Sequence, residues 1–379
     1  MKGGERPHLF LDARKAADFG IGRYVTGLLR ALARAGEFDL TALVRPGAEA
    51  ALPQGVRAIR SDAPNYSLSE LVAVRRAFAR SGATLLHAPH YVVPLLPPPA
   101  TVVTIHDLIH LTRPEHDTFL RRAYARRMLR RAVKAAGKVL TVSAAVAKDL
   151  EAFFPGAADK TVVVPNGVDE RFFEPVGNEE LARFTAGRHL GPQWLLFLGN
   201  DKPHKNLDGL LAAFALLAAS GTAPVKLVLA GGAPGRREDR AGKVAALGLA
   251  GLVVDAGVVP DEEVRLLVGG ASALVLPSFD EGFGIPVLEA QALGTPVVCS
   301  DRGGLQAAAG GAAILVDPAS IEELSSAMAR ILSDEPLRAR LAAAGRIRAR
   351  AFTWDAAAAR TAAVYREVLE RERRGSTGG

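Results

Sequence analysis

Short, almost wholly apolar runs alternate along the chain with longer segments in which apolar residues recur at helical spacing. In the first half, the apolar runs that predict β-strands are 8–13, 40–44, 84–88, 101–107, 138–143 and the start of 160–169. The segments with helical period between them are 22–36, 68–80 and 118–136. Nearly continuous apolar strands that are separated by helices are typical of parallel sheets covered on both faces.

The same alternation starts again after a charged, turn-rich stretch near residues 169–192. The strands expected in this second half are 194–199, 225–231, 252–259, 273–278 and 295–301. The helices expected there are 206–218, 237–248, 261–271 and 285–294. We therefore expect an α/β protein with two Rossmann-like domains, 1–172 and 173–352, and a long helix with a flexible tail at 353–379. Ligands of such sheets bind outside the carboxyl ends of the strands, so two facing sheets would form an interdomain cleft.

Composition narrows the class of protein. The chain has 379 residues, 49% of them hydrophobic, which excludes a disordered protein. No apolar run approaches the ~20 residues of a membrane-spanning helix, and the first residues lack the apolar core of a signal peptide. The single cysteine, Cys299, excludes an internal disulfide and a cysteine-rich metal site. We expect a cytoplasmic protein.

The net charge of +7 is compatible with an anionic partner. Seven basic residues and no acidic one lie in the segment 120–134. On a helix, Arg126, Arg127 and Arg130 would lie largely opposite Tyr124 and Met128. This face is either an ordinary solvated surface or a site of electrostatic contact with an anionic membrane, at the inner membrane face. Basic residues interleaved with aromatics, as in nucleic-acid interfaces, are not found, so nucleic acid is not an expected partner.

The stretch "DEGFGIPVLEA" places two carboxylates, Glu281 and Glu289, around a glycine loop that follows an apolar strand and opens a helix. Pro286 suits the first helical turn. The N–H groups around Gly282–Ile285 and the helix dipole can face a phosphate, while the two carboxylates can accept hydrogen bonds from sugar hydroxyls. In the alternative reading, Glu281 only caps the helix and Glu289 is solvated.

The stretch "GNDKPHKN" follows the strand at 194–199 and brings basic side chains to its carboxyl end. Lysine suits a diphosphate as a point charge. The stretch "DFGIGRY" joins the first strand to a helix, and its glycines Gly20 and Gly22 allow close approach of a ligand. It is not a G-x-G-x-x-G fingerprint, and no acidic residue lies at the ribose-reading distance, which argues against a nicotinamide dehydrogenase.

Histidines follow two strands of the first half. His106 and Asp107 come at the end of one strand, and His90 follows another. His106 is either a core histidine with satisfied hydrogen bonds or a site residue. A metal cluster of His106, His110 and His116 is rejected because its spacing fits no metal motif. A D-x-D sequence, which would hold a diphosphate through a metal, is also absent from the sequence.

These motifs together resemble the retaining glycosyltransferases of the GT-B fold, specifically glycosyltransferase family 4 (glycosyl transferases group 1). "DEGFGIPVLEA" resembles the E-x7-E signature of that family. Further stretches follow in family order over nearly the whole chain: "FGIGRYVTGLLRAL", "IHDLIHLTRPE", "TVSAAVAKDL", "VPNGVD", "FLGNDKPHKNLDGLLAAF", "LVLAGG" and "FTWDAAAARTAAVYREVL". The resemblance implies a nucleotide-sugar donor on the C-terminal domain, an acceptor on the N-terminal domain, and a closing helix that returns to the N-terminal domain.

The resemblance also implies roles for single residues. Lys205 matches the lysine that binds the donor diphosphate. Asn200 stands where the family often has an arginine, so the second charge would come from Lys202 or His204. His106 matches a histidine at the active centre, close to the transferred sugar, and Asp107 would orient it.

Glu281 would bind hydroxyls of the transferred sugar and Glu289 the nucleotide ribose. His90 is a candidate on the acceptor side. The other residues expected at the donor are Gly20, Gly22, Asn200, Lys202, Ser278, Gly282, Phe283, Gly284 and Ile285.

We therefore expect an enzyme of polysaccharide biosynthesis that transfers a hexose with retention of configuration. The first guess for the donor is GDP-mannose, and the acceptor would be a glycan, a lipid-linked sugar or a small molecule. No cofactor and no metal are expected. The alternatives are a nucleotide-sugar epimerase of the same fold and a non-catalytic, two-lobed nucleotide-sugar binding protein.

Overall fold

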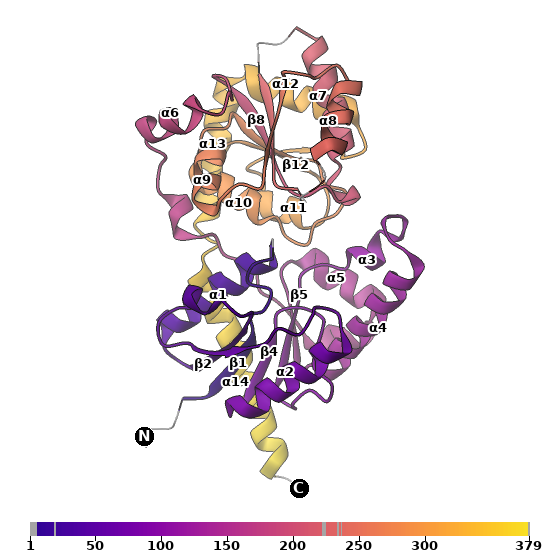
Figure 1. Cartoon of the computed structure of the whole chain (residues 1–379), viewed down its shortest axis with the longest axis vertical. Helices are drawn as coiled ribbons and strands as arrows, with labels where there is room; N and C mark the ends of the chain where they lie inside the picture. Colours follow the sequence, from indigo (N-terminus) through magenta and orange to yellow (C-terminus); the bar gives the residue numbers. More distant parts are fainter. Residues whose placement is uncertain (1–5, 19, 222–224, 233–234, 236, 378–379) are drawn as a thin grey trace. The chain divides into compact units, whose positions relative to one another are not determined.

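Figure 1 shows the computed structural model of the chain, which describes residues 6–18, 20–221, 225–232, 235 and 237–377. The chain forms two compact units. Unit 1 comprises Met1–Gly167 and Thr353–Gly379, and unit 2 comprises Val168–Phe352. The sequence placed the boundary after residue 172. The structure places it after Gly167, because the Val168 N–H donates to the Phe352 carbonyl at 2.9 Å and a 3₁₀ turn at Glu170–Phe173 packs on a helix of unit 2.

The sheet of unit 1 has seven parallel strands in the order β3-β2-β1-β4-β5-β6-β7. Its strands are β1 (His8–Asp12), β2 (Asp39–Val44), β3 (Arg57–Arg60), β4 (Leu85–Ala88), β5 (Thr101–Ile105), β6 (Lys138–Thr141) and β7 (Thr161–Val163). The order reverses between β1 and β4, which is where open α/β sheets bind ligands. The strand β3 was not predicted: it is an edge strand whose residues are largely exposed, so it has no apolar run.

The helices of unit 1 are α1 (Ile21–Ala35), α2 (Leu68–Ser81), α3 (Ile109–Thr112), α4 (Phe119–Ala135), α5 (Ala144–Phe153) and α14 (Trp354–Thr377). Four of them, α1, α2, α4 and α14, agree with the predicted segments, whereas α3 and α5 were not predicted. Serine or threonine side chains cap α2, α4 and α5, each accepting a hydrogen bond from a backbone N–H of the first turn. Left-handed glycines, Gly36 and Gly82, end α1 and α2.

The C-terminal helix α14 belongs to the core of unit 1, as the resemblance implied (Figure 1). It packs along α1, and Gly27 of α1 has no room for a side chain because a Cβ there would lie 2.2 Å from the Trp354 ring. The ion pair between Arg34 of α1 and Asp355 of α14, at 2.6 Å, also links the two helices. The helix continues through Thr377, so residues 375–377, which the sequence analysis placed in the tail, are helical. Residues 378–379 lie outside the described residues.

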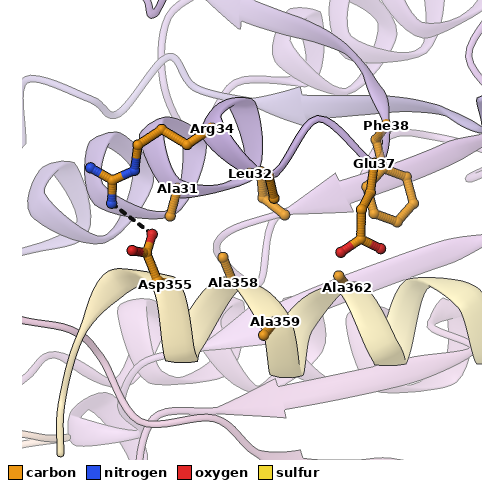
Figure 2. Close-up of a pocket in the computed structure, with 10 residues that line it drawn as sticks. Ala31, Leu32, Arg34, Glu37, Phe38, Asp355, Ala358, Ala359 and Ala362 are labelled. Atoms are coloured by element: carbon orange, nitrogen blue, oxygen red, sulfur yellow. Dashed lines mark hydrogen bonds and ion pairs between the residues drawn. The ribbon is translucent and has the colours of Figure 1, made fainter.

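A pocket of about 310 Å³ lies where the alanine-rich side of α14 meets the end of α1 (Figure 2). Its lining is mostly apolar, with Ala358, Ala359 and Ala362 on one wall, and the Arg34–Asp355 pair closes one end. Ligand sites usually combine apolar walls with several convergent polar groups. This pocket is better explained as a groove left by small side chains between two helices.

Unit 2 contains a six-stranded parallel sheet in the order β10-β9-β8-β11-β12-β13. Its strands are β8 (Trp194–Leu198), β9 (Lys226–Ala230), β10 (Val253–Gly257), β11 (Ala273–Leu276), β12 (Val297–Ser300) and β13 (Ile314–Val316). Its helices are α6 (Asn178–Ala186), α7 (Leu207–Ala219), α8 (Arg237–Ala246), α9 (Asp261–Gly269), α10 (Ile285–Leu293), α11 (Gly303–Ala309), α12 (Ile321–Ser333) and α13 (Glu335–Ala349). The strand order reverses between β8 and β11, so the loops after these two strands are neighbours.

Each sheet is thus a doubly wound α/β sheet, which confirms the expected fold class. None of the described helices is both long and apolar enough to cross a lipid bilayer.

Candidate active site

The glycine loop of unit 2 connects β11 to α10. Gly284 is the N-cap residue of α10 and has a left-handed φ of 106°, which favours glycine. No side chain caps α10, so the reading in which Glu281 serves as its cap is wrong. Pro286 lies in the first turn, where its missing N–H costs nothing. The Val287 N–H donates to the Gly284 carbonyl at 3.0 Å, so what α10 offers an anion is mainly the positive end of its dipole.

The loop is held against the start of α11. The Gly304 N–H donates to the Glu281 carbonyl at 2.9 Å, and a Cβ on Gly304 would lie 2.4 Å from the backbone of Gly282. Phe283 and Ile285 are buried, and the Phe283 ring packs against Phe352 with the ring centroids 6.0 Å apart. These two side chains anchor the loop, so only their backbone groups are suited to contact a ligand.

The Glu281 carboxylate is the centre of a polar cluster at the switch point of unit 2. Lys205, in the loop after β8, donates a hydrogen bond from Nζ to Glu281 Oε1 and forms an ion pair with it. Ser278 donates from Oγ to the same oxygen at 3.0 Å. The fold thus brings together three of the residues that the sequence indicated. Both charged side chains are mostly buried but keep access to solvent, with 19% of Lys205 and 16% of Glu281 exposed.

Asn200 and Lys202 lie on the same loop as Lys205. The Lys202 N–H donates to Asn200 Oδ1 at 3.2 Å, and this hydrogen bond stabilises the turn of the loop. The Lys202 side chain is exposed. His204 is only 6% exposed. Of the two candidates for a second charge toward a diphosphate, Lys202 is therefore the more accessible.

Glu289 lies one helical turn into α10 and is only 2% exposed. The reading of Glu289 as a solvated helical residue is therefore wrong. A buried carboxylate is retained where polar groups compensate for its lost hydration. Glu289 is the fifth of the nine residues of α10, beyond the first turn, so the helix dipole does not account for its burial.

Gly20 and Gly22 shape the start of α1 in unit 1. Gly20 is the N-cap residue of α1 and has a φ of 72°. A Cβ on Gly22 would lie 2.4 Å from the Ala16 carbonyl oxygen, so only glycine lets α1 begin so close to the turn that follows β1. Both glycines thus have a structural reason that is independent of any ligand.

His106 lies just beyond β5 in a mostly buried environment. Its Nε2 is 3.0 Å from the Pro89 carbonyl oxygen, so Nε2 carries the hydrogen and donates it. Burial lowers the pKa of His106 to about 4, although Asp107 and the Pro89 carbonyl act in the opposite direction. The ring is therefore neutral at pH 7, with its Nδ1 lone pair available to accept a hydrogen bond. Asp107 Oδ1 accepts from the Ile109 N–H at 3.2 Å.

His90 belongs to a buried polar cluster that the sequence analysis did not find. Its Nδ1 accepts the Val92 N–H at 3.0 Å, so a neutral ring carries its hydrogen on Nε2. This Nε2 lies 3.6 Å from Asp12 Oδ2 and has no hydrogen-bond partner among the described residues. Arg14 joins Asp12 and Glu70 through ion pairs of 2.6 and 2.9 Å. Burial would raise the pKa of Asp12, but its bonds to Arg14 outweigh this effect and hold it well below its usual range.

A metal ion needs several ligating side chains in a suitable arrangement. Within the described part of the chain, no group of three or more His, Cys, Asp or Glu side chains is arranged to hold a metal ion. At the unit 2 site, positive charge comes from Lys205 and from the N-terminal end of the α10 dipole, and the exposed Lys202 lies on the same loop as Lys205.

The chain matches two family models and is similar to known mannosyltransferases. The model of Glycosyltransferase Family 4 matches residues 20–172, and that of Glycosyl transferases group 1 matches residues 178–348. The O-antigen chain mannosyltransferase B of Escherichia coli is 30% identical over 283 residues, which are 74% of this chain and 74% of that protein. The MMP alpha-(1->4)-mannosyltransferase of Mycolicibacterium hassiacum is 33% identical over 248 residues, which are 64% of this chain and 57% of that protein.

The fold has solved counterparts as well. Sucrose-phosphate synthase from Thermosynechococcus elongatus superposes with a TM-score of 0.78 at 24% identity, over 97% of this chain and 100% of that one. The resemblance indicated by the motifs is thereby confirmed. The chain is a glycosyltransferase that belongs to family 4, the glycosyl transferases group 1, and has the GT-B fold.

Proposed function

We propose that this glycosyltransferase transfers a hexose with retention of configuration from a nucleoside diphosphate sugar. The observation that carries the proposal is the cluster of Lys205, Glu281 and Ser278 beside the uncapped N-terminus of α10. It offers an ammonium group and the positive end of a helix dipole to a diphosphate, and a carboxylate to sugar hydroxyls. Buried Glu289, on the same helix, is proposed to bind the ribose of the nucleotide.

The proposed reaction forms one glycosidic bond and breaks one bond to phosphate. The acceptor oxygen bonds to the anomeric carbon on the face from which the diphosphate departs. The bond from that carbon to the phosphate oxygen breaks, and the leaving diphosphate takes the proton of the acceptor hydroxyl. Lys205 and the N-terminus of α10 stabilise the charge that develops on the diphosphate, which is electrostatic catalysis of leaving-group departure.

The proposed donor is GDP-mannose, and the proposed acceptor is a glycan or a lipid-linked sugar. Support for mannose comes from the two relatives, whose names describe mannosyltransferases. Residues of unit 1, His106 with Asp107 and His90 among them, are proposed to contact substrate hydroxyls, because the neutral His106 ring offers a hydrogen-bond acceptor.

A membrane-bound acceptor is favoured by the surface of α4. Its buried side comprises Ala125, Met128, Leu129, Ala132 and Val133. On the outward side, Phe119 and Leu120 are 73% and 78% exposed, and exposed Arg126, Arg127 and Arg130 follow along the same helix. The sequence analysis left open an ordinary solvated surface or electrostatic contact with a membrane. Because Phe119 and Leu120 are not needed for the core, we propose that they enter the headgroup region of an anionic leaflet while the arginines bind its charges.

A panel of nucleotide sugars tests the reaction. The protein is incubated with GDP-mannose, UDP-glucose and other nucleotide hexoses, with and without acceptor and with excess chelator. We expect transfer from one donor, and we expect it to persist in chelator because Lys205 supplies the charge that a metal would otherwise supply. Donor isomerisation without transfer would indicate the epimerase alternative, and binding without turnover would indicate a binding protein.

A further inference from the structure

A continuous chain of buried hydrogen bonds links the C-terminal helix to the central strands of unit 1. The Tyr365 hydroxyl lies 2.6 Å from His87 Nδ1, and His87 Nε2 lies 2.8 Å from Thr104 Oγ1. Thr104 Oγ1 in turn lies 2.8 Å from the Tyr24 hydroxyl. All four side chains are at most 2% exposed. These hydrogen bonds thus run from α14 through β4 and β5 to α1, and every member is buried.

This chain ends against His106. The Tyr24 ring packs edge-on against the His106 ring, with 4.7 Å between the ring centroids. The same two strands also carry the other contact of His106. Thr104, on β5, lies two residues before His106, and His87, on β4, lies two residues before Pro89, whose carbonyl accepts the His106 Nε2 hydrogen. The groups that fix the His106 ring are therefore the groups that the buried chain holds in place.

This series of hydrogen bonds requires a neutral His87 ring. Burial, together with His106 and His90, lowers the pKa of His87 to about 3, and burial raises the pKa values of Tyr24 and Tyr365. A neutral imidazole has one ring nitrogen that donates and one that accepts, which matches a site with a hydroxyl group on each side. Removal of the Tyr365 hydroxyl would leave His87 Nδ1 buried without its partner, so His87 would be free to change tautomer or to tilt.

We propose that Tyr365 is a positioning residue, which fixes the orientation of the His106 ring through His87, Thr104 and Tyr24. The return of α14 to unit 1 thereby does more than cover the sheet: it holds a site histidine so that Nε2 faces the Pro89 carbonyl and Nδ1 stays available for a substrate hydroxyl. The catalytic consequence rests on the proposed function, whereas the orientation of the ring is a property of the free protein.

The test compares Tyr365→Phe with a matched control on the same helix. Thr361 lies one turn earlier, is fully buried, and donates only to the Ala357 carbonyl, at 2.8 Å. Thr361→Val therefore also removes one buried hydroxyl but leaves the chain to His106 intact. Both variants are examined by ¹⁵N NMR of the histidine rings in the free protein, with His106 assigned from the signal that His106→Asn lacks. Steady-state kinetics with the donor follow.

We expect His106 in the unaltered protein to show a protonated Nε2 and an unprotonated Nδ1. Tyr365→Phe should shift the His87 and His106 ring signals and lower kcat on the order of 10-fold with little change in donor KM, because misplaced groups cost turnover more than binding. Thr361→Val should change neither readout, even if it lowers the melting temperature to the same extent.

Unchanged His106 signals in Tyr365→Phe would overturn the proposal, whatever the activity. Shifted signals with an unchanged kcat would overturn the positioning role. If the unaltered protein transfers no sugar, the proposed function fails instead, and the NMR comparison still decides whether Tyr365 controls the His106 ring.

Discussion

Lys205 and Glu281 form an ion pair across the switch point of the unit 2 sheet, where the loops after β8 and β11 meet. The pair is mostly buried, and Ser278 donates to the carboxylate oxygen that Lys205 contacts. In the protein without a donor, Glu281 therefore supplies the negative charge that Lys205 needs. A bound diphosphate would take over this role and leave the carboxylate free to accept hydrogen bonds from sugar hydroxyls.

Glu281→Gln keeps the shape of the side chain and removes its charge. We expect turnover to fall ~10-fold or more, since a charged hydrogen bond contributes ~1.5–3 kcal/mol and ~1.4 kcal/mol is a factor of ten. Binding of the free nucleoside diphosphate should be equal or tighter, because Lys205 loses its internal partner. Glu322→Gln, which makes the same change at an exposed position of α12, is the control. Unchanged transfer kinetics in a folded Glu281→Gln protein would make this acid purely structural.

Glu289→Gln should act on donor affinity more than on turnover, because the proposed role of this buried carboxylate is to bind the ribose and not the reacting sugar. Calorimetric titration with the nucleoside diphosphate measures the affinity, and initial rates at saturating donor measure kcat. An equal affinity in Glu289→Gln and the unaltered protein would exclude the ribose role. A melting experiment first shows whether the helix α10 tolerates the change.

Unit 1 should lose stability as the pH falls from about 6.5 toward 4. His87 and His106 have folded-state pKa values of about 3 and 4, below the ordinary value of 6.5, so the unfolded chain binds more protons in this range. Each histidine should lower the free energy of unfolding by ~1.4 kcal/mol per pH unit in that window.

The stability of unit 1 can be followed by urea unfolding with Trp354 as the probe, in a Trp194→Phe background because Trp194 belongs to unit 2. In this background His106→Asn should reduce the pH dependence of the free energy of unfolding by ~1.4 kcal/mol per pH unit, the contribution of one histidine. A slope that is the same with and without His106 would show that this ring is not held neutral by the fold.

Vesicle binding tests the surface of α4. We expect reversible binding to anionic vesicles, little binding to neutral ones, and release as salt rises, since the Debye length is ~8 Å at physiological salt. Replacing Arg126, Arg127 and Arg130 with glutamine should abolish most of the binding. Phe119→Ser with Leu120→Ser should weaken it at high salt in particular, where the apolar contribution remains.

The control for the vesicle experiment lies in unit 2, where Ile347 is 75% exposed and Arg340 is exposed on the same helix, α13. Ile347→Ser with Arg340→Gln should leave vesicle binding unchanged. Equal sedimentation with neutral and anionic vesicles would return α4 to the simpler interpretation, a solvated basic surface, and would favour a soluble acceptor.

The sequence predicted the elements whose pattern is strong. Buried strands such as Ala273–Leu276 are apolar throughout, and helices such as Ile21–Ala35 show a clear period and end at a glycine. The exposed edge strand β3 has no apolar run, and α11 and β13 are only 7 and 3 residues long. The helices α12 and α13, of 13 and 15 residues, were also left unassigned, and their length does not explain this. Local pattern therefore predicts elements that the core determines, and it fails where an element is short or at an edge.

The same contrast holds for the site. Glu281 was found because it lies in a contiguous motif, and Lys205 because it follows a strand. Their ion pair joins residues 76 positions apart, and the bond between Tyr365 and His87 spans 278 positions. Asp12, Arg14 and Glu70 read as ordinary charged residues in the sequence, and only the fold buries them together. Pairings of this kind depend on tertiary contact, which a single sequence does not reveal.

The central claim is retention of configuration at a metal-free diphosphate site built around Lys205. It is tested most directly by ¹H NMR of GDP-mannose in buffer with chelator, with water as the acceptor if no other is known. We expect the mannose released first to be the α-anomer, as in the donor, and we expect Lys205→Ala to abolish its release. Initial release of the β-anomer would show inversion of configuration, and full activity of Lys205→Ala would show that this lysine does not stabilise the leaving diphosphate.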